Sequence, residues 1–309
     1  MTDSQTTAWV KAMPAVFVLI WSTGFIVARY GMPYAPPFTF LLFRYFFSIL
    51  CFLPWIVLAR VAWPRDRQQV LHLAVTGMLM HAGYLGGVWA AVKSGMGSGL
   101  SALIVGIQPV LTAIWLSTMS RSGGAAVSRR QWLGLLLGFV GLVMVVSRKF
   151  VQGTPLDHVT PENMAWAVMA LLAITSGTLY QKRFVQPCDV RTANTVQLMA
   201  AALVTIPLAW LEPEGMQWNG QLMGAMAWSV LGLTLGGSSL LYLLIQRGAA
   251  ATVASLMYLV PPTTAAIAWL LFDEQITAMT LLGTAITAVG VSLVVRAPAP
   301  ASAPAPVKA

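Results

Sequence analysis

Ten apolar runs constrain this chain more than any other feature of its sequence. A transmembrane helix needs about 20 mostly apolar residues, and little sequence remains between these runs. Helices are the expected form, because a helix satisfies its own backbone hydrogen bonds in lipid. We therefore predict an all-α integral membrane protein. Its ten expected spans are 13–30, 37–58, 70–92, 98–119, 131–147, 164–181, 193–211, 221–245, 249–272 and 278–295.

The composition excludes most soluble classes of protein. Hydrophobic residues make up 58% of the chain and charged residues only 9%, whereas a typical soluble domain has about 25% charged residues. Such a chain has too little polar surface for an ordinary cytosolic enzyme or a nucleic-acid-binding domain. It is also too apolar and too poor in charge for a disordered protein.

The basic residues predict the orientation. If the N-terminus is inside, thirteen Lys and Arg residues fall in inner segments and four in outer loops, while Arg44 lies within a span. This bias follows the positive-inside rule. We therefore expect both termini to be cytoplasmic. Residues 297–309 form a Pro/Ala tail that we expect to be disordered.

The two halves of the sequence resemble each other, segment by segment and in the same order. Each half holds five predicted helices, and because five is odd, the second half must enter the membrane in the opposite orientation. Inverted repeats of this kind are typical of secondary transporters, which bind their substrate near the midplane. We predict a first repeat at 1–153 and a second at 154–296. The matching segments are 22–24 with 175–177, Pro54 with Pro207, 107–109 with 259–261 and 134–146 with 283–295, at offsets of 153, 153, 152 and 149.

Several motifs make the chain resemble a known family. They are Ile-Trp-Ser-Thr-Gly-Phe at 20–25, Phe-Arg-Tyr at 43–45, Pro261 followed by Glu274, and the two glycine-rich closing helices. With these features the chain resembles the ten-helix EamA branch of the drug/metabolite transporter (DMT) superfamily. Within that branch it is most similar to the aromatic amino acid exporters (YddG-like). The chain departs from the family pattern at one position. Glu274 follows Pro261 by thirteen residues, and the equivalent position after Pro109 in the first repeat should also be acidic but is Ser122.

The resemblance implies a secondary transporter of a bacterial-type inner (plasma) membrane, which works by alternating access around a midplane cavity. We expect it to export small amphipathic metabolites, in particular aromatic and neutral amino acids. No Asp or Glu falls inside a predicted span, although proton relays usually use carboxylates or histidines within the membrane. A facilitator is therefore favoured over carboxylate-based proton coupling, with coupling through His81 as the alternative.

The candidate substrate-binding residues are polar or aromatic side chains at mid-span. His81 shares a helical face with Tyr84, and a polar ring at that depth is costly without a purpose. Arg44 can attract a substrate carboxylate, or it can have a structural role and bind helix-end carbonyls or a loop carboxylate, and the sequence leaves both roles open. Its counterpart in the second repeat is neutral Gln197. The full set is His81, Tyr84, Trp21, Gln108, Ser101, Arg44, Tyr242, Gln246 and Tyr258.

Other aromatic residues are assigned to the membrane interfaces, where Trp and Tyr form belts. We also expect Ser101, Gln108 and Trp115 to share one face of the fourth helix, and Pro261 and Pro262 to break the ninth helix. The interface set is Trp9, Trp55, Trp132, Trp210 and Trp218, together with Trp89, Trp166 and Tyr180.

Other functions remain as alternatives. No cofactor, metal site or nucleic-acid partner is expected, and the two cysteines are interpreted as incidental thiols. The expected partners are a small-molecule substrate and the lipid bilayer. The oligomeric state stays open, with a monomer as one interpretation. The runner-up is a transporter of nucleotide sugars or cationic drugs. A channel is a weaker alternative, as is a membrane lipid enzyme that uses the acidic pair Asp273 and Glu274.

Overall fold

The computed structural model describes residues 3–96, 101, 104–120, 128–151, 160–247, 256–272 and 278–295. Helical structure occurs within each of the ten apolar runs. The helical elements are α1 (Asp3–Gly31), α2 (Pro37–Leu58), α3 (Arg67–Gly77), η1 (Met78–Leu85), α4 (Gly86–Lys93), α6 (Gln108–Ser120), α7 (Arg129–Val151), α8 (Pro161–Phe184), α9 (Val190–Trp210), α10 (Gly220–Trp228), η2 (Ser229–Ser238), α11 (Ser239–Arg247), η3 (Met257–Leu259), α13 (Val260–Phe272) and α14 (Ala278–Val295).

Several helices begin where a polar side chain caps the free backbone N–H groups of the first turn. Thr160 forms a reciprocal capping box with Asn163 at the start of α8. Asp66 accepts hydrogen bonds from Gln68 N and Gln69 N at the start of α3. Asp189 caps α9 and Asn219 caps α10 in the same way. These caps place helix starts in the short polar connections between apolar runs.

Five helical stretches in the described part of the chain are long and apolar enough to cross a membrane. Two shorter apolar stretches, at 12–28 and 281–294, accompany them. Large apolar side chains are exposed on their outer faces, for example Leu203, which is 70% exposed. An exposed apolar surface of this extent is what a lipid environment requires. The chain is thus an all-helical membrane protein with several apolar spans: Pro37–Leu58, Arg67–Lys93, Pro161–Phe184, Val190–Trp210 and Gly220–Ile245.

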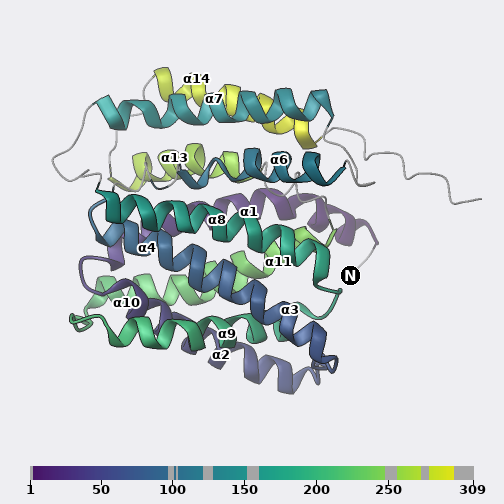
Figure 1. The fold of residues 1–309 in the computed structure, drawn as a ribbon, viewed down its shortest axis with the longest axis vertical. Coiled ribbons are helices and arrows are strands. Elements are labelled where there is room, and N and C mark those ends of the chain that lie inside the picture. Colours follow the sequence, from purple (N-terminus) through teal and green to yellow (C-terminus); the bar gives the residue numbers. More distant parts are fainter. Residues whose placement is uncertain are drawn as a thin grey trace, which may run out of the picture.

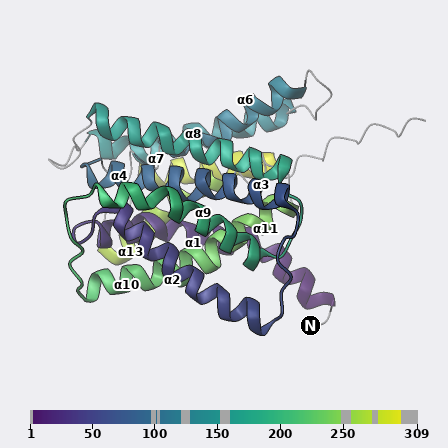
Figure 2. The same ribbon diagram turned by 60° about the horizontal axis from the view of Figure 1, so that its bottom comes forward.

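The helices run roughly side by side and stack in layers (Figure 1). At one end of the stack α7 lies against α14, and at the other end α2 lies against α9. The middle layers hold α1, α8 and the helical segments of the two spans at 67–93 and 220–247 (Figures 1 and 2). At each end of the stack, a helix of the first half therefore packs on its counterpart from the second half.

The contact between α7 and α14 is made by glycines in a reciprocal pattern. A Cβ atom on Gly134 would lie 2.6 Å from Gly290 O, and one on Gly290 would lie 2.5 Å from Gly134 O. A Cβ atom on Gly141 would lie 2.5 Å from Gly283 O. The order of these pairs makes the two helices antiparallel, and small residues allow their backbones to approach closely. These are the glycine-rich segments that align at an offset of 149.

The third predicted span of each half contains a π-helical segment that sequence reasoning missed. These segments are η1 in the first half and η2 in the second. A π-turn has i→i+5 hydrogen bonds, so residues three apart are spread further around the axis than in an α-helix, and π-segments are frequent at functional sites. His81 and Tyr84, which were expected to share a face, lie within η1 and line different pockets.

The fourth span differs from expectation. Gly106 and Ile107 form a turn, and α6 begins only at Gln108. Ser101 and Gln108 are buried whereas Trp115 is 53% exposed, so the prediction that the three share one face is wrong. The ninth span does break, because the 3₁₀ turn η3 precedes α13, which begins one residue before Pro261.

Candidate functional site

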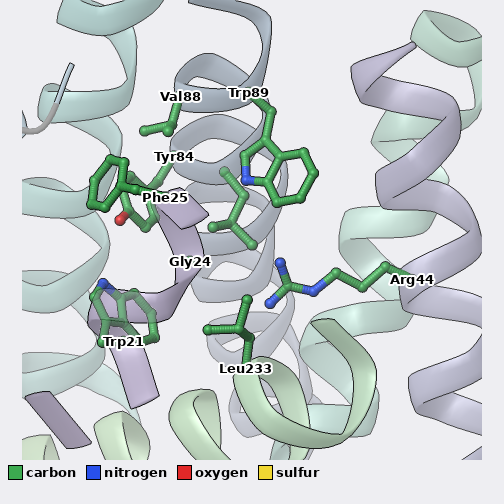
Figure 3. A pocket seen from close by; sticks show the side chains of 9 residues that line it. Trp21, Gly24, Phe25, Arg44, Tyr84, Val88, Trp89 and Leu233 are labelled. Atoms are coloured by element: carbon green, nitrogen blue, oxygen red, sulfur yellow. The ribbon is translucent and has the colours of Figure 1, made fainter. Parts of the chain in front are cut away.

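A pocket in the middle of the bundle, here called the Arg44 pocket, joins one cationic side chain to an aromatic wall. Arg44 enters it from α2, while Trp21 and Phe25 from α1 and Tyr84 from η1 lie on the opposite side (Figure 3). Trp89 of α4 and Leu233 of η2 lie to either side of the guanidinium (Figure 3). The pocket is therefore amphipathic. Its lining residues are Trp21, Gly24, Phe25, Arg44, Tyr84, Leu85, Val88, Trp89 and Leu233.

Arg44 is buried without a counter-charge in the described part of the chain. Its side chain is 3% exposed, and Nε donates a hydrogen bond to Thr234 Oγ1 at 2.9 Å. Two of the described carboxylates have other partners, since Glu214 pairs with Lys93 and Asp189 pairs with Arg191. The two terminal nitrogens of Arg44 face the pocket (Figure 3). Because an unpaired buried cation is costly, this guanidinium is well suited to bind an anionic group of a solute.

The aromatic wall consists of rings held by other rings. Trp21 and Tyr84 are stacked, with centroids 6.3 Å apart and an interplanar angle of 4°. Trp89 stacks on Phe40 at 4.7 Å and is only 3% exposed. The assignment of Trp89 to an interface belt is therefore wrong, because its ring lies against the core although its position is near a span end. Trp55, Trp210 and Trp218 are at least half exposed, as interface residues should be.

The first turn of α2, which carries Arg44 two turns later, is held by a distant carboxylate. Its N-cap residue Pro36 supplies no side-chain cap. Glu212, in the connection between α9 and α10, instead accepts hydrogen bonds from Phe38 N at 2.8 Å and from Thr39 N at 2.7 Å. Thr39 Oγ1 donates a third hydrogen bond to it at 2.7 Å. A carboxylate at a helix N-terminus is also favoured by the helix dipole.

A second pocket, here called the Gln197 pocket, is polar and neutral. Gln181 and Gln197 are each 3% exposed, and their Nε2 atoms have no hydrogen-bond partner in the described residues. His81 and Gln197 both line this pocket, and Tyr45 Oη donates a hydrogen bond to His81 O at 2.8 Å. Trp21 lines both pockets. The lining residues here are Trp21, Met80, His81, Gln181, Gln197, Ser238, Leu241 and Tyr242.

The structure divides the predicted site residues into three groups. Trp21, Arg44 and Tyr84 line the Arg44 pocket, and His81 and Tyr242 line the Gln197 pocket with Trp21. The remaining described residues lie elsewhere, and the side chain of Gln246 lies outside the described residues. Ser101 is buried away from both pockets, Gln108 Nε2 donates to Thr178 Oγ1 at 3.3 Å, and the ring of Tyr258 packs where Gly138 has no side chain.

Both pockets are contracted. The Arg44 pocket leaves about 30 Å³ for the centres of water-sized molecules, and the Gln197 pocket about 10 Å³. A buried water needs about 10–15 Å³ of such space, so the pockets have room for about two waters and one water. A larger solute can enter only if helices or side chains move apart.

Among the described residues, no group of three His, Cys, Asp or Glu side chains could hold a metal ion. Cys188 Sγ lies 3.0 Å from Tyr242 Oη, and Cys51 is exposed on α2.

Comparisons with known proteins match the chain to one family model and to uncharacterized transporters. A sequence model of the family described as "EamA-like transporter family" matches residues 11–147 and 163–296, one stretch in each half. The "Uncharacterized inner membrane transporter YedA" of Escherichia coli (strain K12) is 26% identical over 225 residues, which cover 71% of this chain and 68% of that protein. An "Uncharacterized transporter" of Archaeoglobus fulgidus is 22% identical over 289 residues, 90% of this chain and 94% of that protein.

A solved crystal structure shares the fold. It aligns with a TM-score of 0.73 at 16% sequence identity, and the alignment covers 91% of this chain and 94% of that chain. At this identity the likeness concerns the fold alone.

Proposed function

The chain belongs to the EamA-like transporter family of the DMT superfamily, and from this premise we propose that it exports small amphipathic metabolites, aromatic and other neutral amino acids in particular. The family consists of membrane transporters and not of enzymes. The proposal places ten spans in two inverted repeats, 1–153 and 154–296. Both termini are cytoplasmic in this proposal, and the membrane is a bacterial-type inner membrane.

The observation that carries this proposal is the position of Arg44 opposite an aromatic wall. A carboxylate of the solute would accept hydrogen bonds from the terminal nitrogens of Arg44. Such charge-assisted hydrogen bonds are stronger than neutral ones. An aromatic or aliphatic side chain would lie against Trp21 and Trp89. The ammonium group next to the carboxylate would be attracted to the faces of the same rings. A free amino acid with an apolar side chain matches this combination.

The contracted pockets support alternating access. Helices that close around a midplane cavity must separate on one side at a time to admit a solute. The π-segments η1 and η2 each line both pockets. They are suited to such rearrangement, because a π-turn departs from the regular i→i+4 ladder of hydrogen bonds.

Facilitated transport is the favoured coupling mode. The acidic side chains that the structure describes, such as Glu162, Asp189 and Glu212, lie in connections or in the first turn of a helix. A carboxylate relay at mid-span is therefore not supported there. His81 remains the alternative proton carrier within a described span.

The alternative substrates fit the Arg44 pocket less well. A cationic drug would be repelled by the guanidinium. A nucleotide sugar carries two phosphates and a large polar surface, whereas the pocket offers one cation and a mostly aromatic and aliphatic wall.

Purified protein in liposomes should exchange labelled L-phenylalanine or L-tryptophan and should show no exchange of UDP-glucose. Exchange of UDP-glucose without exchange of any amino acid would show that the substrate proposal is wrong. Current that flows continuously across a planar bilayer would instead indicate a channel.

A further inference from the structure

The two pockets are built from equivalent positions of the two halves. Five residues of the Arg44 pocket have a counterpart 153 positions away in the Gln197 pocket. This is the offset at which residues 22–24 align with 175–177. The pairs are Arg44 with Gln197, Leu85 with Ser238, Val88 with Leu241, Trp89 with Tyr242, and Leu233 with Met80.

The contacts around the pockets repeat at the same offset. Arg44 donates a hydrogen bond to Thr234 beside one pocket, and Gln197 and His81 line the other pocket together. His81 and Thr234 are themselves 153 positions apart. Each pair joins the second helix of one half to the π-segment of the other half, so the relation exchanges the two halves.

Glycines of the first and sixth helices follow the same rule. A Cβ atom on Gly24 would lie 3.8 Å from the side chain of Leu233, and one on Gly177 would lie 2.5 Å from Met80 Cγ. Both the glycines and their partners are 153 positions apart. The two pockets are thus related by a pseudo-two-fold axis that exchanges the two halves of the chain. Trp21 lines both of them.

One difference between the two pockets is their charge. Where the Arg44 pocket has a guanidinium, the Gln197 pocket has an amide, and Gln181 adds a second amide. The Nε2 atoms of both amides are buried donors without a partner in the described residues. Leaving a buried donor unsatisfied costs about 1–3 kcal/mol. Two such donors beside one pocket indicate that an acceptor belongs there, which a water supplies in the contracted state and a ligand in the open state.

We propose that the Gln197 pocket is a second solute site, which binds the carboxylate of the solute through the neutral donors of Gln181 and Gln197. Gln181 lines this pocket and directly precedes Lys182 and Arg183, so the pocket is expected to open to the side of the membrane that carries these two residues. The Arg44 pocket, its counterpart in the inverted repeat, is expected to open to the opposite side. Trp21 contacts the solute in both sites. The proposal rests on the proposed transport of amino acids only for the identity of the solute.

The charge difference gives the two sites different affinities. Hydrogen bonds from a charged donor are roughly twice as strong as neutral ones. The solute is therefore held more weakly in the Gln197 pocket, and it passes from a neutral to a cationic site as the protein changes state.

Labelling of single cysteines tests the second site without relying on transport. The variants Leu85→Cys and Ser238→Cys place a thiol at equivalent positions, in the full chain carrying Cys51→Ser and Cys188→Ser. Right-side-out and inside-out membrane vesicles are treated separately with a membrane-impermeant thiol reagent, so that each preparation reports on one side of the membrane. We expect Ser238→Cys to react from the side of Lys182 and Leu85→Cys to react from the other side. Reaction of both from one side, or no reaction of Ser238→Cys from either side, would overturn the proposal. If either variant fails to fold, Leu233→Cys and Met80→Cys form a second matched pair.

Protection by the solute tests the ligand. L-phenylalanine should slow the labelling of Ser238→Cys. Adding Gln197→Leu removes one neutral hydrogen bond to the solute, and it should therefore raise the concentration of L-phenylalanine that gives half protection by up to about tenfold. Ser229→Ala is the matched control, because it removes a buried unpartnered hydroxyl that lines neither pocket. Labelling that L-phenylalanine does not slow, or an equal effect of the control, would overturn the carboxylate assignment. If the unmodified protein exchanges no amino acid, the proposed function fails, while the sidedness of labelling still judges the second site.

Discussion

Arg44 and Gln197 occupy equivalent positions on α2 and α9, and each lines its own pocket together with residues of the π-segment of the other half. Arg44 donates a hydrogen bond to Thr234 of η2, and Gln197 lines its pocket with His81 of η1. The two helices also pack against each other at one end of the stack (Figure 1). This relationship turns a sequence repeat into a pair of sites with different charge. It is the structural basis for the account of solute binding given above.

The glycine contact between α7 and α14 should be sensitive to a single methyl group. Gly290→Ala places Cβ 2.5 Å from backbone atoms of Gly134 and Gly138, so it should lower the free energy of unfolding by about 1–3 kcal/mol through overpacking. Gly224→Ala is the control, because nothing lies within 4 Å of its Cβ. Thermal unfolding in detergent should show a lower Tm for Gly290→Ala only. Equal Tm values for both variants would contradict the close packing.

Removal of the carboxylate that caps α2 should destabilise the fold near Arg44. Glu212→Ala deletes three hydrogen bonds to Phe38 and Thr39 and should cost about 1–2 kcal/mol, with Glu212→Gln between it and the unmodified protein. Glu214→Ala removes an exposed ion pair with Lys93 and should cost less than about 1 kcal/mol. Thermal unfolding ranks the three variants, and a Tm for Glu214→Ala at or below that of Glu212→Ala would count against the cap.

The cap of α9 should become weaker in acid. The hydrogen bonds from the Arg191 side chain hold the pKa of Asp189 below its ordinary value. A lowered carboxyl pKa stabilises the fold above the ordinary pKa of Asp, and this contribution disappears as the pH falls through the lowered value. The Tm difference between the unmodified protein and Asp189→Asn should therefore be present at pH 7 and shrink in strong acid. A difference that grows on acidification would contradict the assignment.

Facilitated transport predicts insensitivity to a proton gradient. Uptake of L-phenylalanine into liposomes should reach the same plateau with and without an imposed pH difference, because the described spans hold no carboxylate relay. Measuring the plateau with the His81→Gln variant separates the alternatives. Accumulation driven by the pH difference and abolished by His81→Gln would establish proton coupling through His81.

Hydropathy predicted where helices lie but not how their backbones bond. The apolar runs placed α2 with the bounds that the structure has, because hydropathy and a proline at the first helical position both mark them. Hydropathy could not reveal the π-segments η1 and η2. It does not distinguish the i→i+4 hydrogen bonds of an α-helix from the i→i+5 hydrogen bonds of a π-helix. His81 and Tyr84 lie within η1 and line different pockets.

The site itself was predicted in part, through residues whose burial is costly. Arg44 and His81 were found because a charge or polar ring in a span needs a purpose, and both line pockets. Trp89 was misassigned because position near a span end does not say which way a ring points. Tyr258 was placed in a cavity, but it fills the space left by Gly138 in a neighbouring helix, a contact that no local pattern encodes.

The most direct measurement of the central claim is the exchange of labelled L-phenylalanine by Arg44 variants in liposomes. Arg44→Gln gives the Arg44 pocket the amide of its counterpart, and it should reduce exchange at low substrate concentration by about 10-fold or more, the worth of a charge-assisted pair. Arg44→Lys should retain part of the activity, since it keeps the charge without the planar fork. Ser48→Ala, one turn along α2 and outside both pockets, should exchange as the unmodified protein does. Undiminished exchange by folded Arg44→Gln would contradict the account.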